Sequence, residues 1–161
     1  EAQVGHRVLM GHSGQPLKDL MLNIPLKEKD YVKEEDASSN GNKENANAMD
    51  VEAESKGKKS VSSLELLEQC IRWGHIAPTA PDSLACYPFI MEDPFIMDSL
   101  PDVFFAGNMD EYATGVVENF AGAKGRNHKT RLVCVPSFKI TGQVVLLDIM
   151  SLDTQLVTFQ A

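Results

Sequence analysis

Two short motifs hold the polar side chains that come closest to a catalytic or metal-binding pattern. The first is Gly107-Asn108-Met109-Asp110, which follows the apolar run Val103-Phe104-Phe105-Ala106. A short apolar run that stops at glycine is typical of a buried strand, so Asn108 and Asp110 are expected at the C-terminal edge of a sheet. Histidines there would form a metal-binding turn, but Asn is a poor transition-metal ligand and a lone Asp cannot hold the ion. We interpret Asn108 and Asp110 as degenerate metal-site positions and predict no metal, no cofactor and no catalytic residue.

The second motif, Gly11-His12-Ser13-Gly14, approaches the Gly-x-Ser-x-Gly turn of serine hydrolases. Its fifth position is Gln15, where the sharp strand-to-helix turn needs a small residue. The motif therefore does not favour a serine hydrolase.

Other candidate sites are equally incomplete. Neither dinucleotide-binding nor P-loop glycine patterns occur, and Gly122-Ala123-Lys124-Gly125-Arg126 lacks the strand-loop-helix context of a phosphate loop. We interpret it as an exposed hairpin tip. The four histidines have no paired spacing, whereas tetrahedral zinc needs four convergent ligands; they are His6, His12, His75 and His128. A pairing of Cys70 with His75 is not favoured either, since a thiol on an apolar helix face is inert.

The elements that must position these motifs can be read from hydrophobic periodicity and turn residues. A strand is expected over residues 4–10, then a turn over 11–16 and a short helix over 17–24. Ser62 and Glu65 form a capping-box pattern, which predicts a helix that ends near Gly74. The remaining predicted strands are 103–106, 131–135, 143–149 and 155–159, with a turn over 136–142. We expect the strands at the C-terminal end of the chain to form an antiparallel meander beside a βα portion.

Composition divides the chain into three parts: 1–26, 27–60 and 61–161. The middle part is dense in Lys, Glu, Asp, Asn and Ser, and Tyr31 is its only aromatic residue. Such a stretch cannot bury enough apolar area to offset the entropy of ordering its backbone. It is predicted to be a disordered insertion within the domain.

A proline-rich stretch from Pro78 to Pro101 forbids regular structure but is rich in large apolar residues. A disordered linker would not carry them, so the stretch is predicted to be an ordered, irregular loop pressed on the core or on a partner. The candidate contact or core-packing residues are Tyr87, Phe89, Phe95 and Ile96.

The overall charge bears on the class of partner. The formal net charge is −8 over 161 residues, and an acidic surface repels the phosphate backbone that supplies most non-specific nucleic-acid affinity. DNA binding by the chain alone is therefore disfavoured. No apolar run is long enough to predict a transmembrane helix. Three cysteines with no close spacing favour a reducing compartment, cytosol or nucleus.

Several long motifs resemble one known family. The run from His75 to Phe89, followed by Asp93-Pro94-Phe95-Ile96, resembles the small (second, or B) subunit of DNA polymerase delta, in the B-subunit family of polymerases alpha, delta and epsilon. The runs 101–108 and 11–15 match the same family in the same order. The likeness covers residues 4–24 and 62–160.

The resemblance implies the fold, the partners and the location. Family members carry an OB-fold domain joined to a calcineurin-like (metallophosphoesterase-type) domain that has lost activity, and this chain is similar to the C-terminal part of that domain. It implies an α/β fragment of a β-sandwich with flanking helices. Active relatives have a Gly-His-x-His turn where this chain has Gly107-Asn108-Met109-Asp110. Members of the family contact the metal-binding C-terminal domain of the catalytic subunit and a third, clamp-linking subunit, in the nucleus.

Three hypotheses of function follow. The first is a non-catalytic scaffold of the polymerase delta complex, which contacts DNA only indirectly and has no membrane association. The second is a residual metal-dependent phosphodiesterase or nuclease, which would need a two-metal centre of His and Asp ligands. The third is direct DNA contact through a local basic patch.

Overall fold

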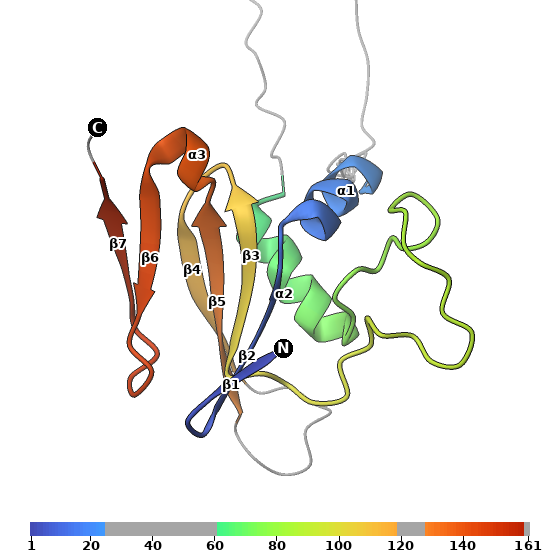
Figure 1. Ribbon diagram of the computed structural model, residues 1–161, viewed down its shortest axis with the longest axis horizontal. Coiled ribbons are helices and arrows are strands. Elements are labelled where there is room, and N and C mark those ends of the chain that lie inside the picture. Colours follow the sequence, from blue (N-terminus) through green and yellow to red (C-terminus); the bar gives the residue numbers. More distant parts are fainter. Residues whose placement is uncertain (25–60, 119–127, 160–161) are drawn as a thin grey trace, which may run out of the picture. The chain divides into compact units, whose positions relative to one another are not determined.

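A five-stranded sheet is the centre of the protein. The computed structural model describes residues 1–24, 61–118 and 128–159, so the predicted insertion 27–60 and the predicted hairpin tip 122–126 lie outside the described residues. The strands are β1 (Ala2–Val4), β2 (Arg7–His12), β3 (Val103–Met109), β4 (Ala113–Glu118) and β5 (Lys129–Pro136). Their order in the sheet is β1-β2-β3-β5-β4, and β2, β3 and β5 run parallel while the outer strands are antiparallel (Figure 1).

The parallel pairing of β5 with β3 corrects one expectation. Phe104 lies opposite Leu132 in a parallel register, and β5 belongs to a different sheet from the next strand along the chain, so the predicted meander is wrong for this strand. The β4 strand, which was not predicted, takes the antiparallel place beside β5 at the edge of the sheet. Ala113 and Gly115 weaken its β-pattern, and only the pairing with β5 makes this segment a strand.

Two helices follow the predicted signals closely. The helix α2 (Ser63–Trp73) has the predicted capping box: the Ser62 hydroxyl accepts from the Glu65 N–H at 3.2 Å, and Glu65 accepts from the Ser62 N–H at 2.9 Å. It ends at Gly74, whose φ of 65° lies in the left-handed region. The helix α1 (Gln15–Asn23) starts two residues before its predicted range, because Pro16 is tolerated in a first turn.

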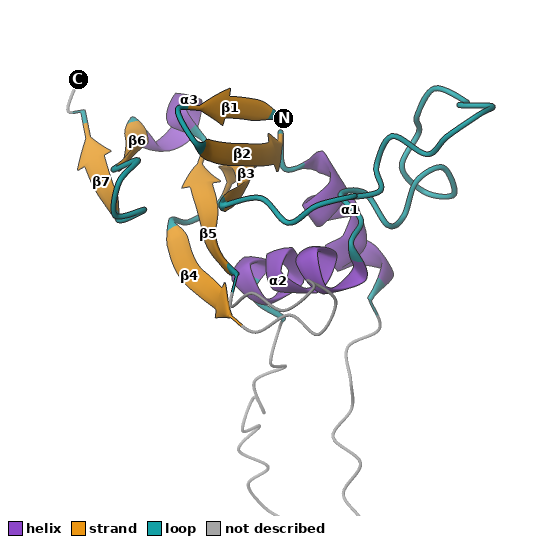
Figure 2. Ribbon diagram, turned by 90° about the horizontal axis from the view of Figure 1, so that it is seen from below, coloured by secondary structure: helices purple, strands orange, loops and turns teal. Residues whose placement is uncertain are grey.

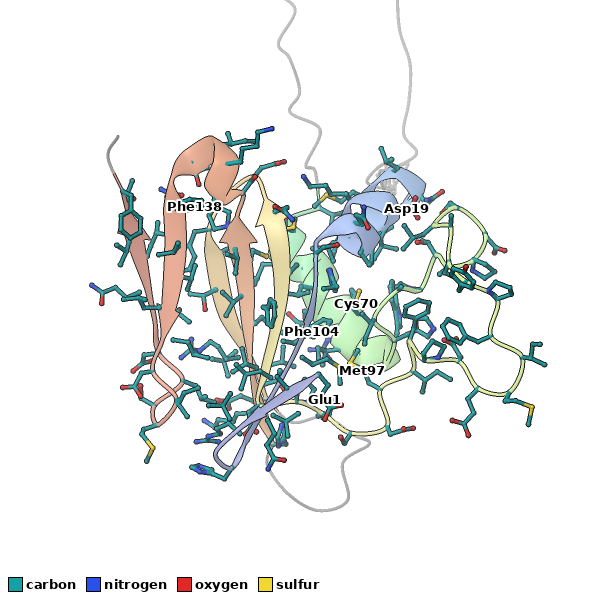
Figure 3. All side chains as sticks on the ribbon, in the orientation of Figure 1. Glu1, Asp19, Cys70, Met97, Phe104 and Phe138 are labelled. Carbon is teal, nitrogen blue, oxygen red and sulfur yellow. The ribbon has the colours of Figure 1, made fainter. Side chains whose placement is uncertain are left out.

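The core lies between these helices and one face of the sheet (Figure 2). In Figure 3, Cys70 on α2 and Phe104 on β3 mark its centre, and both are fully buried. The other main core residues are Met10, Leu17, Leu20, Leu66, Leu67, Ile71, Met97, Ala106, Met109, Leu132 and Cys134.

A second, two-stranded sheet lies on the side of the main sheet away from the helices (Figure 2). It consists of β6 (Gln143–Leu147) and β7 (Thr154–Thr158), which pair antiparallel as predicted. The short helix α3 (Phe138–Thr141) occupies part of the predicted turn before it. Tyr112 hydrogen-bonds Thr154 at 2.7 Å and so ties this sheet to the main one. The α/β class is confirmed as a mixed five-stranded sheet with a small second sheet.

The segment between α2 and β3, residues 74–102, contains no helix or extended strand. Its irregular course agrees with the prediction from its prolines. No helix in the described ranges has the length and apolar character needed to cross a bilayer.

Candidate functional site

The two motifs singled out for chemistry meet at the C-terminal edge of the sheet. The β2–α1 turn presses against the end of β3, since β2 and β3 are parallel neighbours. A Cβ atom on Gly14 would lie 2.0 Å from the Gly107 carbonyl oxygen, and the φ of Gly14 is +93°. Only glycine permits both this approach and this backbone conformation. We call this contact of residues 11–14 with residues 107–110 the edge junction.

Asn108 and Asp110 make structural contacts in the edge junction. The Asn108 side-chain amide donates to the Ser13 carbonyl at 3.1 Å, and Asn108 has a φ of 51°, which asparagine tolerates better than most residues. The Asp110 carboxylate is 92% exposed and lies 3.7 Å from Lys18 Nζ. Within the described ranges, no three His, Cys, Asp or Glu residues come together as a possible metal site. Asn108 and Asp110 contribute one amide and one exposed carboxylate beside a lysine, instead of convergent His and Asp ligands, so they do not fit a two-metal centre.

His12 is the most perturbed group of the edge junction. Its Nδ1 accepts a hydrogen bond from the Gly14 N–H at 3.0 Å, and its buried Nε2 has no hydrogen-bond partner in the described part of the chain. Its ring meets the Phe104 ring edge-on with centroids 5.7 Å apart. Burial lowers the pKa of His12 from 6.5 to about 4, so the imidazole is neutral at physiological pH. Because Nδ1 is engaged with the turn itself, His12 is not set up as a general base for Ser13.

The remaining histidines and cysteines form no group of three that could hold a metal in the described part of the chain. His128 Nε2 lies 3.1 Å from the Pro101 carbonyl, which is a local structural contact. Burial raises the pKa of Cys70 to about 12 and that of Cys134 to about 11. Both thiols are therefore protonated and unreactive, as the apolar helix face predicted for Cys70.

The second region of interest is the irregular segment 74–98, which is fastened at its base. The Ile76 N–H donates to the Phe95 carbonyl at 2.8 Å, and the Met97 N–H donates to the Gly74 carbonyl at 2.8 Å. Buried Met97 anchors the C-terminal end of the segment to the core (Figure 3). The part of the segment between these two hydrogen bonds is therefore attached to the folded domain at both of its ends. We call residues 87–96 the apolar loop.

A histidine and a carboxylate close the base of the apolar loop. His75 Nδ1 accepts from the Ala77 N–H at 3.2 Å, so its other nitrogen carries the proton and lies 3.0 Å from Asp93 Oδ2. Asp93 also accepts from the Phe95 N–H at 2.9 Å. This backbone hydrogen bond, and then the one to His75, hold the pKa of Asp93 below its usual value. These contacts join residues 75–77 to residues 93–95. They could not be predicted from the sequence because they depend on tertiary proximity.

The tip of the apolar loop is turned to solvent. Its exposed fractions are 85% for Tyr87, 57% for Phe89, 93% for Ile90, 90% for Met91 and 54% for Ile96. Phe95 is half-buried, and its ring meets that of Phe89 edge-on at 6.5 Å. Of the four residues named from the sequence, Tyr87, Phe89 and Ile96 therefore lie outside the core, whereas Phe95 packs partly beneath them.

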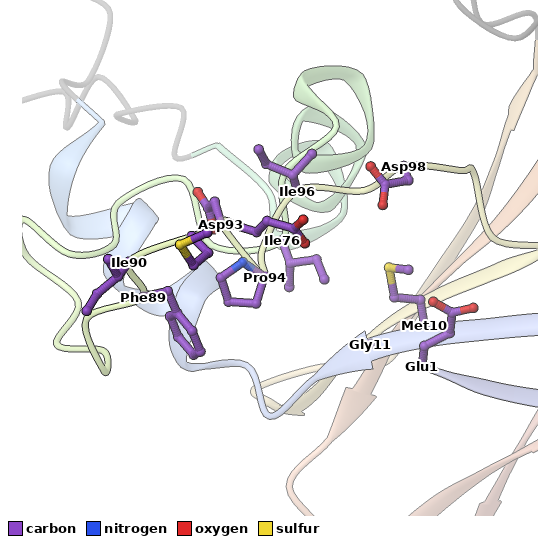
Figure 4. Close-up of a pocket in the computed structure, with 12 residues that line it drawn as sticks. Glu1, Met10, Gly11, Ile76, Phe89, Ile90, Asp93, Pro94, Ile96 and Asp98 are labelled. Atoms are coloured by element: carbon purple, nitrogen blue, oxygen red, sulfur yellow. The ribbon is translucent and has the colours of Figure 1, made fainter.

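A cavity of about 660 Å³ lies between the apolar loop and β2 (Figure 4). Met10, Ile76, Phe89 and Ile96 contribute apolar walls, and Glu92, Asp93 and Asp98 contribute carboxylates. A smaller cavity of about 450 Å³ is lined by Pro81 and Cys86 together with residues of the apolar loop. Sequence analysis missed the acidic lining, although the order of acidic and apolar residues was visible.

Comparison with known proteins gives one consistent family. The family model for the B subunit of DNA polymerases alpha and epsilon matches residues 3–114. The DNA polymerase delta subunit 2 of Drosophila melanogaster is 50% identical over 98 residues, which cover 61% of this chain and 22% of that protein. The DNA polymerase delta small subunit of Oryza sativa subsp. japonica is 41% identical over 96 residues, 60% of this chain and 21% of that protein.

A third relative extends the match along the chain. The DNA polymerase delta small subunit of Saccharomyces cerevisiae is 38% identical over 120 residues, 74% of this chain and 23% of that protein. The chain thus spans about a fifth of the length of the curated relatives that it matches. The resemblance seen in the sequence is confirmed: this chain belongs to the B-subunit family of DNA polymerases alpha and epsilon, and its relatives within that family are small subunits of DNA polymerase delta.

Proposed function

We propose that the chain is part of a non-catalytic accessory subunit of the DNA polymerase delta complex, where it holds other subunits together during DNA replication in the nucleus. The proposed partners are the C-terminal domain of the catalytic subunit and a third subunit that links to the sliding clamp. Membership of the B-subunit family and similarity to polymerase delta small subunits support this assignment.

One structural observation carries the proposal: large apolar side chains are held out into solvent on a fastened loop. Ile90 and Met91 at the tip are about nine-tenths exposed, while Met97 at the base is buried. An exposed apolar patch of this kind marks an interaction surface. Because the loop is already ordered before a partner binds, less conformational entropy is lost on association. More of the free energy of burying each apolar side chain then contributes to affinity.

The edge junction gives no support to the alternative of a phosphodiesterase. Asn108 donates its amide to Ser13 in the β2–α1 turn, and Asp110 pairs with Lys18 on α1, so these residues link the end of β3 to the turn and to the helix that follows it. Direct DNA contact is opposed by the net charge of −8.

The test is reconstitution with the full-length small subunit, the C-terminal domain of the catalytic subunit and the third subunit. We expect both partners to co-elute with the small subunit in size-exclusion chromatography and to separate when it is omitted. Manganese-dependent hydrolysis of a nitrophenyl phosphodiester is measured on the same preparation. Failure of the full-length small subunit to retain either partner would overturn the scaffold proposal, and hydrolysis that His12→Asn or Asp110→Asn abolishes would favour the enzyme.

A further inference from the structure

The charges around the apolar loop have one sign. No Lys or Arg occurs between Arg72 and Lys124, which is the longest such interval in the sequence. The acidic residues of the interval that the structure describes are Asp82, Glu92, Asp93, Asp98, Asp102, Asp110, Glu111 and Glu118. The loop and its surroundings therefore present carboxylates with no local cation from their own segment.

Three of these carboxylates line the 660 Å³ cavity, and they differ in their contacts. Asp93 is engaged by His75 and by the Phe95 N–H. Glu92 and Asp98 are exposed, and neither has an ion-pair partner among the described residues. In Figure 4, Asp98 stands near Met10 and Glu1, opposite the part of the loop that carries Phe89 and Ile90. The cavity thus has apolar walls and an acidic rim.

These features define the chemistry of a complementary segment. Burial of large apolar side chains against Phe89, Ile90 and Ile96 would stabilise a complex by roughly 25 cal/mol per Å² of apolar surface removed from water. A basic residue beside those side chains would meet the unpaired carboxylates of Glu92 and Asp98. An acidic segment, or a phosphate backbone, would be repelled at the same rim.

We infer that the groove between the apolar loop and β2 binds a segment of another subunit in which large apolar side chains are flanked by Lys or Arg. This inference rests on the proposed function, since it takes the occupant from the same complex. It adds to that proposal the surface of the chain that binds the other subunit and the types of side chain that the surface recognises. Carboxylates at the rim accelerate association with the cationic segment and disfavour other apolar chains.

The first experiment locates the occupant. The photo-crosslinking amino acid p-benzoylphenylalanine replaces Ile90 in the full-length small subunit, which is assembled with the catalytic and third subunits. Ile140 on α3 is the matched control, because it is also an exposed isoleucine, at 83%, but lies with the second sheet. We expect position 90, and not position 140, to crosslink to a segment of another subunit that carries Lys or Arg within a few residues. A crosslink to the small subunit itself, including residues that precede Glu1, or to a segment without basic residues, would overturn the inference.

The second experiment tests the rim. Glu92→Lys with Asp98→Lys reverses two carboxylates of the groove, and Glu111→Lys, outside the cavity lining, is the charge control. We expect the double variant to weaken subunit affinity at least tenfold and to reduce its dependence on salt, while the control stays within twofold. Equal thermal unfolding of all variants shows that folding is unaffected. If the wild-type complex does not assemble, the proposed function fails; if it assembles and the double variant binds like wild type, only the groove inference fails.

Discussion

The edge junction and the apolar loop use their side chains in opposite ways. The junction holds residues of catalytic type, His12, Ser13, Asn108 and Asp110, but the contacts of these residues stabilise the β2–α1 turn and fix it to the end of β3. The loop holds residues with no reactive groups at its tip, yet these are the ones exposed to solvent, where the proposed partner would bind. Residue type alone therefore does not reveal a functional site: the direction in which a side chain points, and what already occupies its polar atoms, decide it.

The largest loss of stability is expected when the glycine at position 14 of the edge junction is substituted. Gly14→Ala places a methyl group within 2.0 Å of the Gly107 carbonyl oxygen at a φ of +93°. We expect a loss of about 3 kcal/mol or more in the free energy of unfolding, from overpacking and left-handed strain together. Urea denaturation measures it.

Gly5→Ala is the matched control for that substitution. Gly5 has a φ of +62°, but nothing lies within 4 Å of its added Cβ. It should therefore show only the strain of the left-handed conformation, about 1 kcal/mol. If the two variants were equally stable, the close approach of the two turns would not contribute to stability.

The next effect concerns pH and His12. Its pKa is about 4 in the folded chain and 6.5 unfolded, so the unfolded chain binds more protons between these values. Stability is complete above pH 6.5 and falls as the pH decreases toward 4. We expect a loss of about 2 kcal/mol across this window, which is less than the full shift implies because the ring is only partly enclosed.

The substitution His12→Asn isolates this effect in denaturation curves at pH 7, 5.5 and 4.5. Asparagine can place an oxygen near the position of Nδ1 and accept from Gly14, but it does not titrate. The variant should show a flatter pH dependence over this range. An unchanged slope would assign the pH dependence to other groups.

Substitutions of Asn108 are expected to lower the free energy of unfolding by a smaller amount. Asn108→Ala removes the hydrogen bond to Ser13 and leaves an alanine at a φ of 51°, so we expect a loss of about 1–2 kcal/mol. Asn108→Gly removes the same hydrogen bond but accepts the backbone conformation, and should lose less. Thermal unfolding of both variants separates the two contributions, and a larger loss for Asn108→Gly than for Asn108→Ala would contradict the strain assigned to the backbone at a φ of 51°.

The smallest effect on stability is expected at the tip of the apolar loop. Ile90→Ser should change the free energy of unfolding by less than about 0.5 kcal/mol, because the side chain is 93% exposed. Met97→Ala at the base should lose about 2 kcal/mol or more, since that side chain is buried. Calorimetry on both variants checks this contrast. A large loss for Ile90→Ser would mean that the tip belongs to the core.

Local signals in the sequence predicted much of the framework. Ser62 and Glu65 satisfy each other's backbone groups within one turn, and Gly74 tolerates the left-handed cap, so the bounds of α2 follow from neighbouring residues. The run 103–106 was recognised as a strand because it is continuously apolar. The segment 113–118 was missed because its β-structure depends on pairing with β5, which is distant in sequence.

By itself, the sequence determined the α/β class, the helix α2, the irregular course of residues 78–101 and the family to which the chain belongs. Those features rest on interactions between near neighbours or on long, specific motifs. Only the tertiary structure decided that β5 runs parallel to β3, that Gly14 meets Gly107, and that His75 holds Asp93 beneath the exposed tip. Each of these depends on contacts between residues distant in the chain, whose geometry is set when the strands and helices pack together.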